Sequence, residues 1–135
     1  MKYRDIEQFK YQLAENIVFE TGIRGFSFKG EFLEIRPDGI LTIKYGYLWD
    51  GASGPTIDTD SAMFGALVHD ALYELMRREV IPTTYKDTID RLFHSLLIRD
   101  GMNTLRANMW YDAVSRFAWH TCVPGSETKD KVLEV

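Results

Sequence analysis

The sequence has one cysteine, Cys122, among 135 residues, and it has no long apolar run. One cysteine excludes an intrachain disulfide and any zinc site that is built from several cysteines. No run approaches the roughly 20 apolar residues of a membrane-spanning helix. The formal net charge of −4 gives no basic footprint for nucleic acid. The N-terminal residues 1–12, MKYRDIEQFKYQ, are too charged for a signal peptide.

What the chain does contain is typical of a soluble globular protein. Hydrophobic residues make up 45% of it and charged residues 27%. Its length is that of one ordinary domain, which can bury a real core. We therefore predict a single domain over residues 1–125. The last ten residues, 126–135, form a polar stretch that we expect to be a flexible tail.

The first half of the chain predicts β-structure. Four extended segments are expected, at residues 16–21, 24–29, 31–36 and 40–46. The strongest signal is the turn sequence Pro37-Asp38-Gly39, which separates two runs of mostly alternating apolar residues. A β-hairpin is therefore predicted around this turn.

The second half predicts three helices. Asp58–Asp60 and Ser61 can cap the first helix, which runs to about Glu79. After Pro82, Thr84 and Asp87 resemble a capping box for a second helix, which ends at Asp100-Gly101. Its predicted apolar stripe comprises Ile89, Leu92, Phe93, Leu96 and Leu97.

A third helix is predicted over residues 103–121. Its expected inward-facing residues are Leu105, Met109, Trp110, Ala113, Val114 and Phe117. Strands followed by helices predict the α+β class, with a small antiparallel sheet ahead of a three-helix region. Within the domain, residues 1–46 are expected to be mainly β, residues 47–58 a loop, and residues 59–122 helical.

The first predicted helix carries an adjacent polar pair, His69-Asp70, among apolar residues. On a helical wheel Asp70 lies one turn from Ala66 and Tyr73, which predicts that it points toward the packed side. A carboxylate facing a core is costly unless a metal ion, loop N–H groups or a basic side chain meets it. The alternative is a core histidine beside a capping or salt-bridged aspartate.

The loop before this helix contains residues that turn backbone carbonyls toward a common point, namely Gly46, Gly51, Gly54 and Pro55. Calcium binds carbonyl oxygens together with carboxylates, so this loop facing Asp70 predicts a calcium site. Small residues at Ala62, Gly65 and Ala66 are expected to give the loop room. Asp50 and Ser53 also favour turns by themselves, which is the simpler explanation for them.

On the second predicted helix, Asp90 falls at the edge of the apolar stripe. An antiparallel pair of helices would bring it near His69. A carboxylate that accepts a hydrogen bond from one imidazole nitrogen leaves the other nitrogen as a base. The simpler alternative is that Asp90 is a solvated flank residue.

The stretch from Tyr45-Gly46 through Gly51-Ala52-Ser53-Gly54-Pro55 to the motif His69-Asp70-x-x-Tyr73 resembles the calcium loop and HDxxY helix of phospholipase A2. With Asp90, its spacing is most similar to that of the phospholipase domain of parvovirus capsid proteins. The pattern WDGAS-P, HDxLY and DxxF also resembles a phage-encoded domain family of unassigned function. The resemblance covers residues 45–101.

This resemblance implies a catalytic set of His69 as general base, Asp90 as its orienting carboxylate and Tyr73 as a hydrogen-bond donor to that carboxylate. Calcium would be the cofactor. The implied ligands are Asp70, Leu48, Asp50 and Ala52, with loop support from Gly51, Ser53, Gly54 and Pro55. A bound calcium ion would stabilise the oxyanion formed during ester hydrolysis.

Several features depart from that family. Trp49-Asp50 interrupts the glycine-rich loop, the disulfides of the secreted enzymes are missing, and the N-terminal hairpin has no counterpart. Two other hydrolytic chemistries are disfavoured. No histidine precedes His69 to serve an HD-type phosphohydrolase, and Pro55 breaks the G-x-S-x-G pattern around Ser53. A triad of Ser53, His69 and Asp90 is not required by any motif.

The sequence therefore predicts a phage protein with a calcium-dependent, phospholipase A2-like ester hydrolase site. The alternative is a non-catalytic phage accessory or structural protein that keeps the same loop and helix. The expected partners are a phospholipid or membrane surface, or a phage or host protein, and not nucleic acid. The expected location is the host cytoplasm or the virion.

Overall fold

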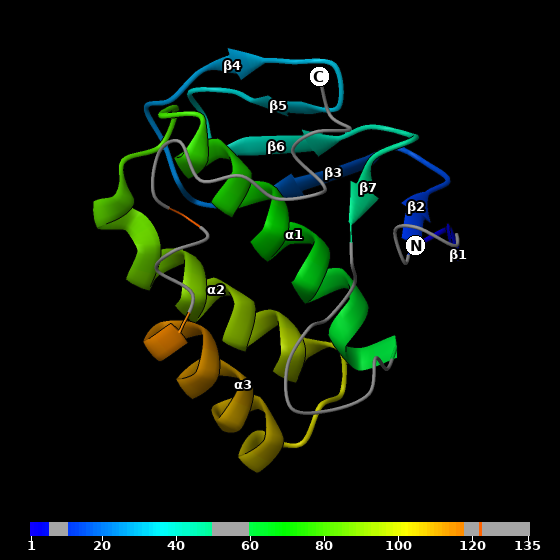
Figure 1. Cartoon of the computed structure of the whole chain (residues 1–135), viewed down its shortest axis with the longest axis vertical. Helices are drawn as coiled ribbons and strands as arrows, with labels where there is room; N and C mark the ends of the chain where they lie inside the picture. The colour runs from blue at the N-terminus through cyan, green and yellow to red at the C-terminus, as the bar shows by residue number, and fades with distance from the viewer. Residues whose placement is uncertain (6–10, 50–59, 118–121, 123–135) are drawn as a thin grey trace. The chain divides into compact units, whose positions relative to one another are not determined.

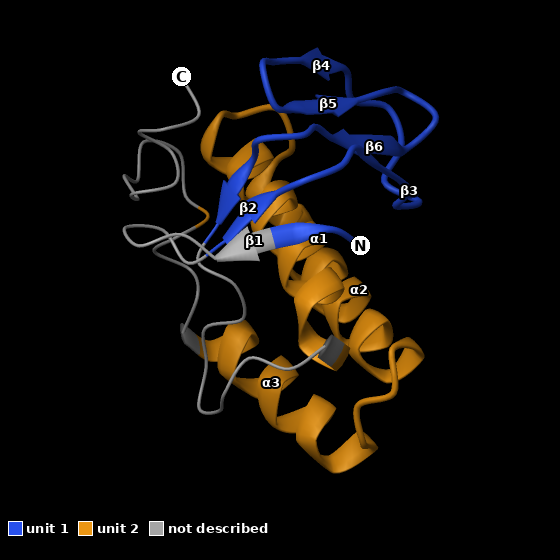
Figure 2. Ribbon diagram, turned by 90° about the vertical axis from the view of Figure 1, so that its right-hand side faces the viewer, with its two compact units in different colours: residues 1–50, 127–135 blue, residues 51–126 orange. Residues whose placement is uncertain are grey.

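The computed structural model describes residues 1–5, 11–49, 60–117 and 122 (Figure 1). The chain has the α+β fold expected from its sequence, with antiparallel strands first and three helices after them. It divides into two compact units. Unit 1 is Met1–Asp50 with Glu127–Val135, and unit 2 is Gly51–Ser126 (Figure 2). The single domain over residues 1–125 stays a prediction, and the tail at 126–135 lies outside the described residues.

Unit 1 is built from two antiparallel sheets. One has the strand order β1-β2-β7 and the other the order β3-β6-β5-β4. The strands are β1 (Tyr3–Asp5), β2 (Tyr11–Leu13), β3 (Ile17–Glu20), β4 (Phe28–Lys29), β5 (Leu33–Ile35), β6 (Ile40–Ile43) and β7 (Leu48–Trp49). Alternate residues of β5 and β6, such as Leu33 and Leu41, are fully buried. This alternation is what places one face of the four-stranded sheet in a core.

The predicted hairpin is confirmed. Strands β5 and β6 pair antiparallel, with Leu33 opposite Ile43 and Ile35 opposite Leu41. The turn closes through a hydrogen bond from the Gly39 backbone N–H to the Arg36 carbonyl at 2.8 Å. Gly39 has φ +89°, a conformation that residues with side chains rarely adopt. The sequence Pro37-Asp38-Gly39 therefore sets this register locally.

Other strand predictions were less accurate. The segment predicted at residues 24–29 is a strand only at Phe28–Lys29. The strands β1 and β2 were not predicted, and β7 lies inside the segment predicted as a loop at residues 47–58. In β7, Leu48 pairs with Gln12 and Trp49 with Tyr11. This partner is distant in sequence, so a two-residue strand leaves no local pattern to detect.

Unit 2 contains the helices α1 (Asp60–Arg77), α2 (Lys86–Arg99) and α3 (Thr104–Phe117), with a short 3-10 helix at Thr83–Tyr85. The predicted stop at Gly101 is confirmed, because this residue has φ +99° and its N–H bonds the Ile98 carbonyl. The predicted capping box is wrong. The helix α2 begins at Lys86 after Tyr85, with no side-chain capping hydrogen bond.

The three helices share one apolar cluster. Its buried members are Ala62, Ala66, Phe93, Leu97, Met102, Ala107 and Trp110. A Cβ atom at Gly65 would lie 3.4 Å from side-chain atoms of both Phe93 and Leu97. The small residues of α1 therefore let α2 approach closely, whereas the sequence had suggested that they make room for the loop.

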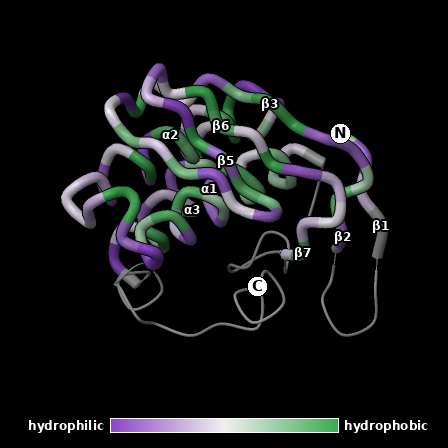
Figure 3. The backbone as a smooth tube through the Cα atoms, turned by 90° about the horizontal axis from the view of Figure 1, so that it is seen from above, coloured by the Kyte–Doolittle hydropathy of each residue, from purple (hydrophilic) through white to green (hydrophobic). Residues whose placement is uncertain are grey.

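The helix α3 faces the cluster with only part of its predicted stripe. Trp110 is buried, but Leu105 and Met109 are exposed, so the prediction that they point inward was wrong. Hydrophobic and hydrophilic residues alternate along this helix in Figure 3. None of the helices in the described part of the chain combines the length and the hydropathy needed to cross a bilayer.

Candidate functional site

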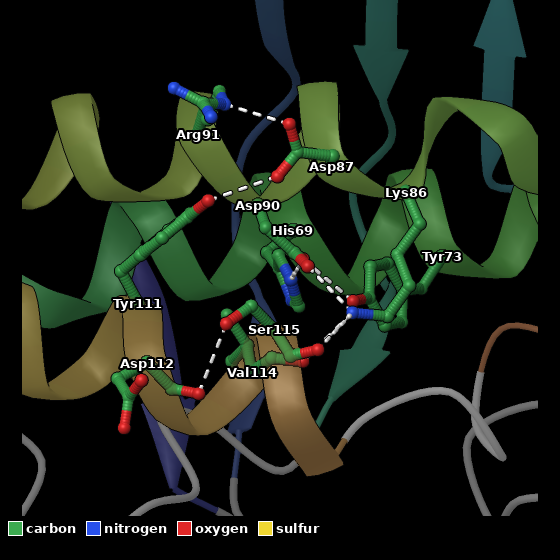
Figure 4. A network of polar contacts seen from close by, with 10 residues as sticks. All are labelled: His69, Tyr73, Lys86, Asp87, Asp90, Arg91, Tyr111, Asp112, Val114 and Ser115. Atoms are coloured by element: carbon green, nitrogen blue, oxygen red, sulfur yellow. Dashed lines mark hydrogen bonds and ion pairs between the residues drawn. The ribbon is translucent and has the colours of Figure 1, made fainter.

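The centre of the candidate site is a hydrogen bond between α1 and α2. His69 Nε2 lies 2.8 Å from Asp90 Oδ1 (Figure 4). The Asp90 side chain is fully buried, and that of His69 is 7% exposed. The predicted proximity of these two residues is therefore present, whereas the simpler interpretation of Asp90 as a solvated flank residue is wrong.

Tyr73 contacts the same carboxylate oxygen of Asp90 as His69 does. Its hydroxyl donates a hydrogen bond of 2.6 Å to Asp90 Oδ1, the oxygen that also meets His69. Tyr73 follows His69 by four residues, so one turn of α1 aligns both donors on the same face. The imidazole packs against the rings of Tyr73 and Phe93, with centroid distances of 4.1 and 4.8 Å. These contacts leave the His69 ring little freedom to rotate.

The second oxygen of Asp90 meets a lysine that the sequence analysis did not single out. Lys86 Nζ lies 2.7 Å from Asp90 Oδ2, and both side chains are almost entirely buried. The same ammonium donates to the carbonyls of Val114 at 2.9 Å and Ser115 at 3.2 Å, in the last turn of α3. Oδ1 of Asp90 thus connects α2 to α1. Oδ2 connects α2 to α3 by way of Lys86.

These contacts decide the charge of each group. Burial alone would raise the pKa of Asp90, but the hydrogen bonds from His69, Lys86 and Tyr73 together hold that pKa below its usual value. Burial lowers the pKa of His69, against the opposing effect of its bond to Asp90. Burial and the bond to Asp90 raise the pKa of Tyr73 well above its usual value. At neutral pH the set is an ionised Asp90 with a neutral His69 and a neutral Tyr73.

The tautomer of His69 follows from this charge state. An ionised carboxylate only accepts hydrogen bonds, so Nε2 must carry the proton that it shares with Asp90. A neutral imidazole then has its lone pair on Nδ1. This arrangement leaves Nδ1 as the ring nitrogen that is able to accept a proton.

Asp70 lies beside this nitrogen, although not as the sequence predicted. Its Oδ1 atom is 4.0 Å from His69 Nδ1, and its side chain is 33% exposed. The sequence predicted that Asp70 points toward the packed side, but its side chain is one third exposed and that of His69 is the more buried of the two. A partly exposed carboxylate is one oxygen ligand of the kind that a hard cation takes.

The remaining predicted ligands are not brought together with Asp70 by any described contact. Leu48 is a strand residue of unit 1, where a loop had been predicted. The other predicted loop residues lie outside the described residues: Asp50, Gly51, Ala52, Ser53, Gly54 and Pro55. Within the described ranges no group of three His, Cys, Asp or Glu side chains is placed to hold a metal. A calcium site made mainly of carbonyl oxygens would not form such a group. Of the implied calcium ligands, Asp70 is therefore the one whose described side chain can be compared with what calcium binds.

Two residues of the site were missed by sequence reasoning. Lys86 precedes Asp90 by four residues, and on a predicted helix this spacing was a usable signal for an ion pair. Cys122 is fully buried and interacts electrostatically with Lys86 and Asp90, and burial raises the pKa of its thiol. Nothing in its surrounding sequence indicates that position.

Comparisons with known proteins found no similar protein. No family model, no curated protein and no solved structure matches the chain.

Proposed function

We propose that this chain is a phage protein with a calcium-dependent, phospholipase A2-like ester hydrolase site in which His69 is the general base. The observation that carries the proposal is the buried contact between His69 Nε2 and Asp90 Oδ1, reinforced by the Tyr73 hydroxyl on the same oxygen. A buried histidine with one nitrogen held by a carboxylate is the arrangement that leaves a base at the other nitrogen.

In this function, His69 Nδ1 takes a proton from a water molecule as the water attacks the ester carbonyl. Asp90 stabilises the imidazolium that forms, because its carboxylate already accepts the proton on Nε2. Tyr73 fixes the orientation of that carboxylate. Asp70 would hold the calcium ion, with oxygens of Leu48, Asp50 and Ala52 as the further ligands that the resemblance implies. Calcium, when bound, polarises the ester carbonyl and stabilises the developing oxyanion.

Calcium binding is tested by thermal unfolding with and without the ion. A ligand present at 100 times its Kd stabilises the native state by about 2.7 kcal/mol, so wild-type protein should unfold at a higher temperature in calcium than in chelator. Asp70→Asn should abolish the shift. Asp112→Asn is a matched control, because Asp112 is an exposed aspartate of α3 that pairs with Arg116.

Hydrolysis is measured on vesicles of phosphatidylcholine and phosphatidylglycerol, by release of free fatty acid. Wild-type protein should release fatty acid in calcium and not in chelator, and Asp112→Asn should behave like wild type. A melting temperature that is unchanged by calcium, together with no fatty acid release, would exclude the proposal.

A second candidate function is a non-catalytic phage accessory or structural protein that uses the same residues to join its helices. The observation that favours it is the low exposure of His69, whose ring is covered by Tyr73 and Phe93. In that case Asp70→Asn and Asp50→Asn should destabilise the protein while no hydrolysis is lost. Wild-type hydrolysis above the chelator control would exclude this second candidate.

A further inference from the structure

The resemblance to phospholipase A2 assigns no role to Lys86, the lysine that contacts Asp90. Lys86 is the first residue of α2. A cation at the N-terminus of a helix opposes the dipole of that helix, so the position itself disfavours a lysine. Burial of an ammonium is also costly unless oxygens replace its water. A residue placed against both effects has to be stabilised by specific partners.

Those partners are the oxygens around Nζ. An ammonium has three N–H donors, and three oxygens surround Nζ at 2.7, 2.9 and 3.2 Å, namely Asp90 Oδ2 and the carbonyls of Val114 and Ser115. The two carbonyls belong to the last turn of α3, which is the negative end of that helix dipole. The ammonium is therefore unfavourably placed for α2 but favourably placed for α3 and for Asp90.

The bonding pattern also separates the two oxygens of Asp90. Oδ1 accepts from the two uncharged donors, His69 and Tyr73, whereas Oδ2 accepts from Lys86. Without Lys86 the carboxylate would be fully buried with only neutral donors. It would then take up a proton rather than stay charged. A protonated Asp90 can itself donate a hydrogen bond to Nε2 of His69. The contact with Asp90 would then no longer require a proton on Nε2.

We propose that Lys86 is a positioning residue of the site, whose ammonium supplies the fixed positive charge that keeps Asp90 ionised and its Oδ1 directed at His69, so that His69 retains the Nε2–H tautomer. Its importance for catalysis rests on the proposed function. The arrangement itself is tested without any substrate.

The chain offers a matched control on the same helix. Arg91 pairs with Asp87 at 2.7 Å, with the same separation of four residues as Lys86 and Asp90. That pair is exposed. Arg91→Met therefore removes a positive charge from α2 without touching Asp90, and Lys86→Met removes the one that contacts it. Lys86→Arg is the conservative variant that keeps a positive charge.

The readout is the long-range ¹H–¹⁵N correlation spectrum of the histidine rings in the full-length protein at pH 7, with His69 assigned by its loss in His69→Gln. Wild type, Arg91→Met and Lys86→Arg should show one protonated nitrogen, Nε2, and one unprotonated nitrogen, Nδ1. Lys86→Met should lose this single-tautomer pattern. A Lys86→Met variant that retains the wild-type pattern, or an Arg91→Met variant that loses it, would overturn the proposal.

If Lys86→Met does not fold, two further measurements test the role of Lys86. Lys86→Gln keeps a donor near Asp90 but carries no charge, and it should also lose the pattern. The carboxyl ¹³C shift of Asp90 in wild-type protein should be that of an ionised group at pH 7, and a shift typical of a protonated acid would overturn the proposal.

Failure of this inference and failure of the proposed function give different results. A wild-type protein with the expected tautomer but no fatty acid release would exclude hydrolysis and leave the role of Lys86 intact. Where release is measurable, Lys86→Met should lower kcat and leave KM nearly unchanged, because Lys86 acts through Asp90 and His69. An unchanged kcat in this variant would contradict its role in positioning.

Discussion

The helix α2 carries two similar sets of polar contacts on two of its sides, one exposed and one buried (Figure 4). Asp87 accepts hydrogen bonds from Arg91 and from the hydroxyl of Tyr111. Asp90 accepts them from Lys86, from the hydroxyl of Tyr73 and from His69. Both sets join an aspartate to a cation four residues away and to a tyrosine on another helix.

What differs between the two sets is the solvent. The Asp87 side chain is 62% exposed, whereas that of Asp90 is fully buried. Water screens the first set, so its contacts contribute little to stability. The second set is unscreened, so each contact controls the charge of its neighbours. Similar residues of α2 therefore form an exposed ion pair in one set and a buried candidate site in the other.

The largest expected difference is in the cost of removing each aspartate. Asp90→Ala should lower the free energy of unfolding by about 3–5 kcal/mol, because it leaves the ammonium of Lys86 buried without its counter-charge. Asp87→Ala should lower it far less, since exposed ion pairs contribute at most about 1 kcal/mol. Urea denaturation of both variants measures the difference. Equal losses would show that the burial of Asp90 is not as described.

The tyrosines should show a smaller difference in the same direction. Tyr73→Phe removes a hydroxyl that donates to a buried carboxylate, and a hydrogen bond to a charged group contributes about 1.5–3 kcal/mol. Tyr111→Phe removes the corresponding hydroxyl from the exposed set, where water can replace it. The double-mutant cycle of Tyr73→Phe with Asp90→Ala should give a larger coupling energy than that of Tyr111→Phe with Asp87→Ala. Coupling energies in the reverse order would refute the comparison.

The smallest effect is on the pH dependence of stability. The pKa of His69 is lower in the folded protein than the value of about 6.5 that an unfolded chain has. The unfolded state therefore binds the proton more readily, and stability should fall as the pH drops below about 6.5, by at most about 1.4 kcal/mol per pH unit for one proton. The depressed pKa of Asp90 adds a further loss below about pH 3.9.

Urea denaturation between pH 8 and pH 5 measures the contribution of His69. His69→Gln should flatten the profile in that range, because the glutamine does not titrate. A profile that stays as steep in His69→Gln as in wild type would assign the effect to other groups.

The sequence predicted those features that depend on local pattern. The turn at Pro37-Asp38-Gly39 and the helix stop at Gly101 are set by residues that favour one backbone conformation, and both are present. The proximity of His69, Tyr73 and Asp90 was also predictable, because helical spacing aligns the first two and an antiparallel pair of helices brings Asp90 near His69.

The remaining features depend on contacts between distant residues. The pairing of β7 with β2 needs a partner more than thirty positions away, so the short strand at Leu48–Trp49 left no signal. The exposure of Asp70 depends on how α1 packs, which a helical wheel does not determine. Lys86 was overlooked because charged residues are rarely buried. Leu105 and Met109 fit an apolar stripe, although α3 presents other residues to the core.

The central claim is that His69, held by Asp90, acts as a base on a water molecule. The direct test is the rate of fatty acid release from phospholipid vesicles in calcium by wild type and by His69→Gln, which preserves a donor to Asp90 but has no basic nitrogen. A general base contributes a factor of about 100–10,000, so the variant should be slower by that factor while it remains folded. Equal rates in the two proteins would contradict the claim.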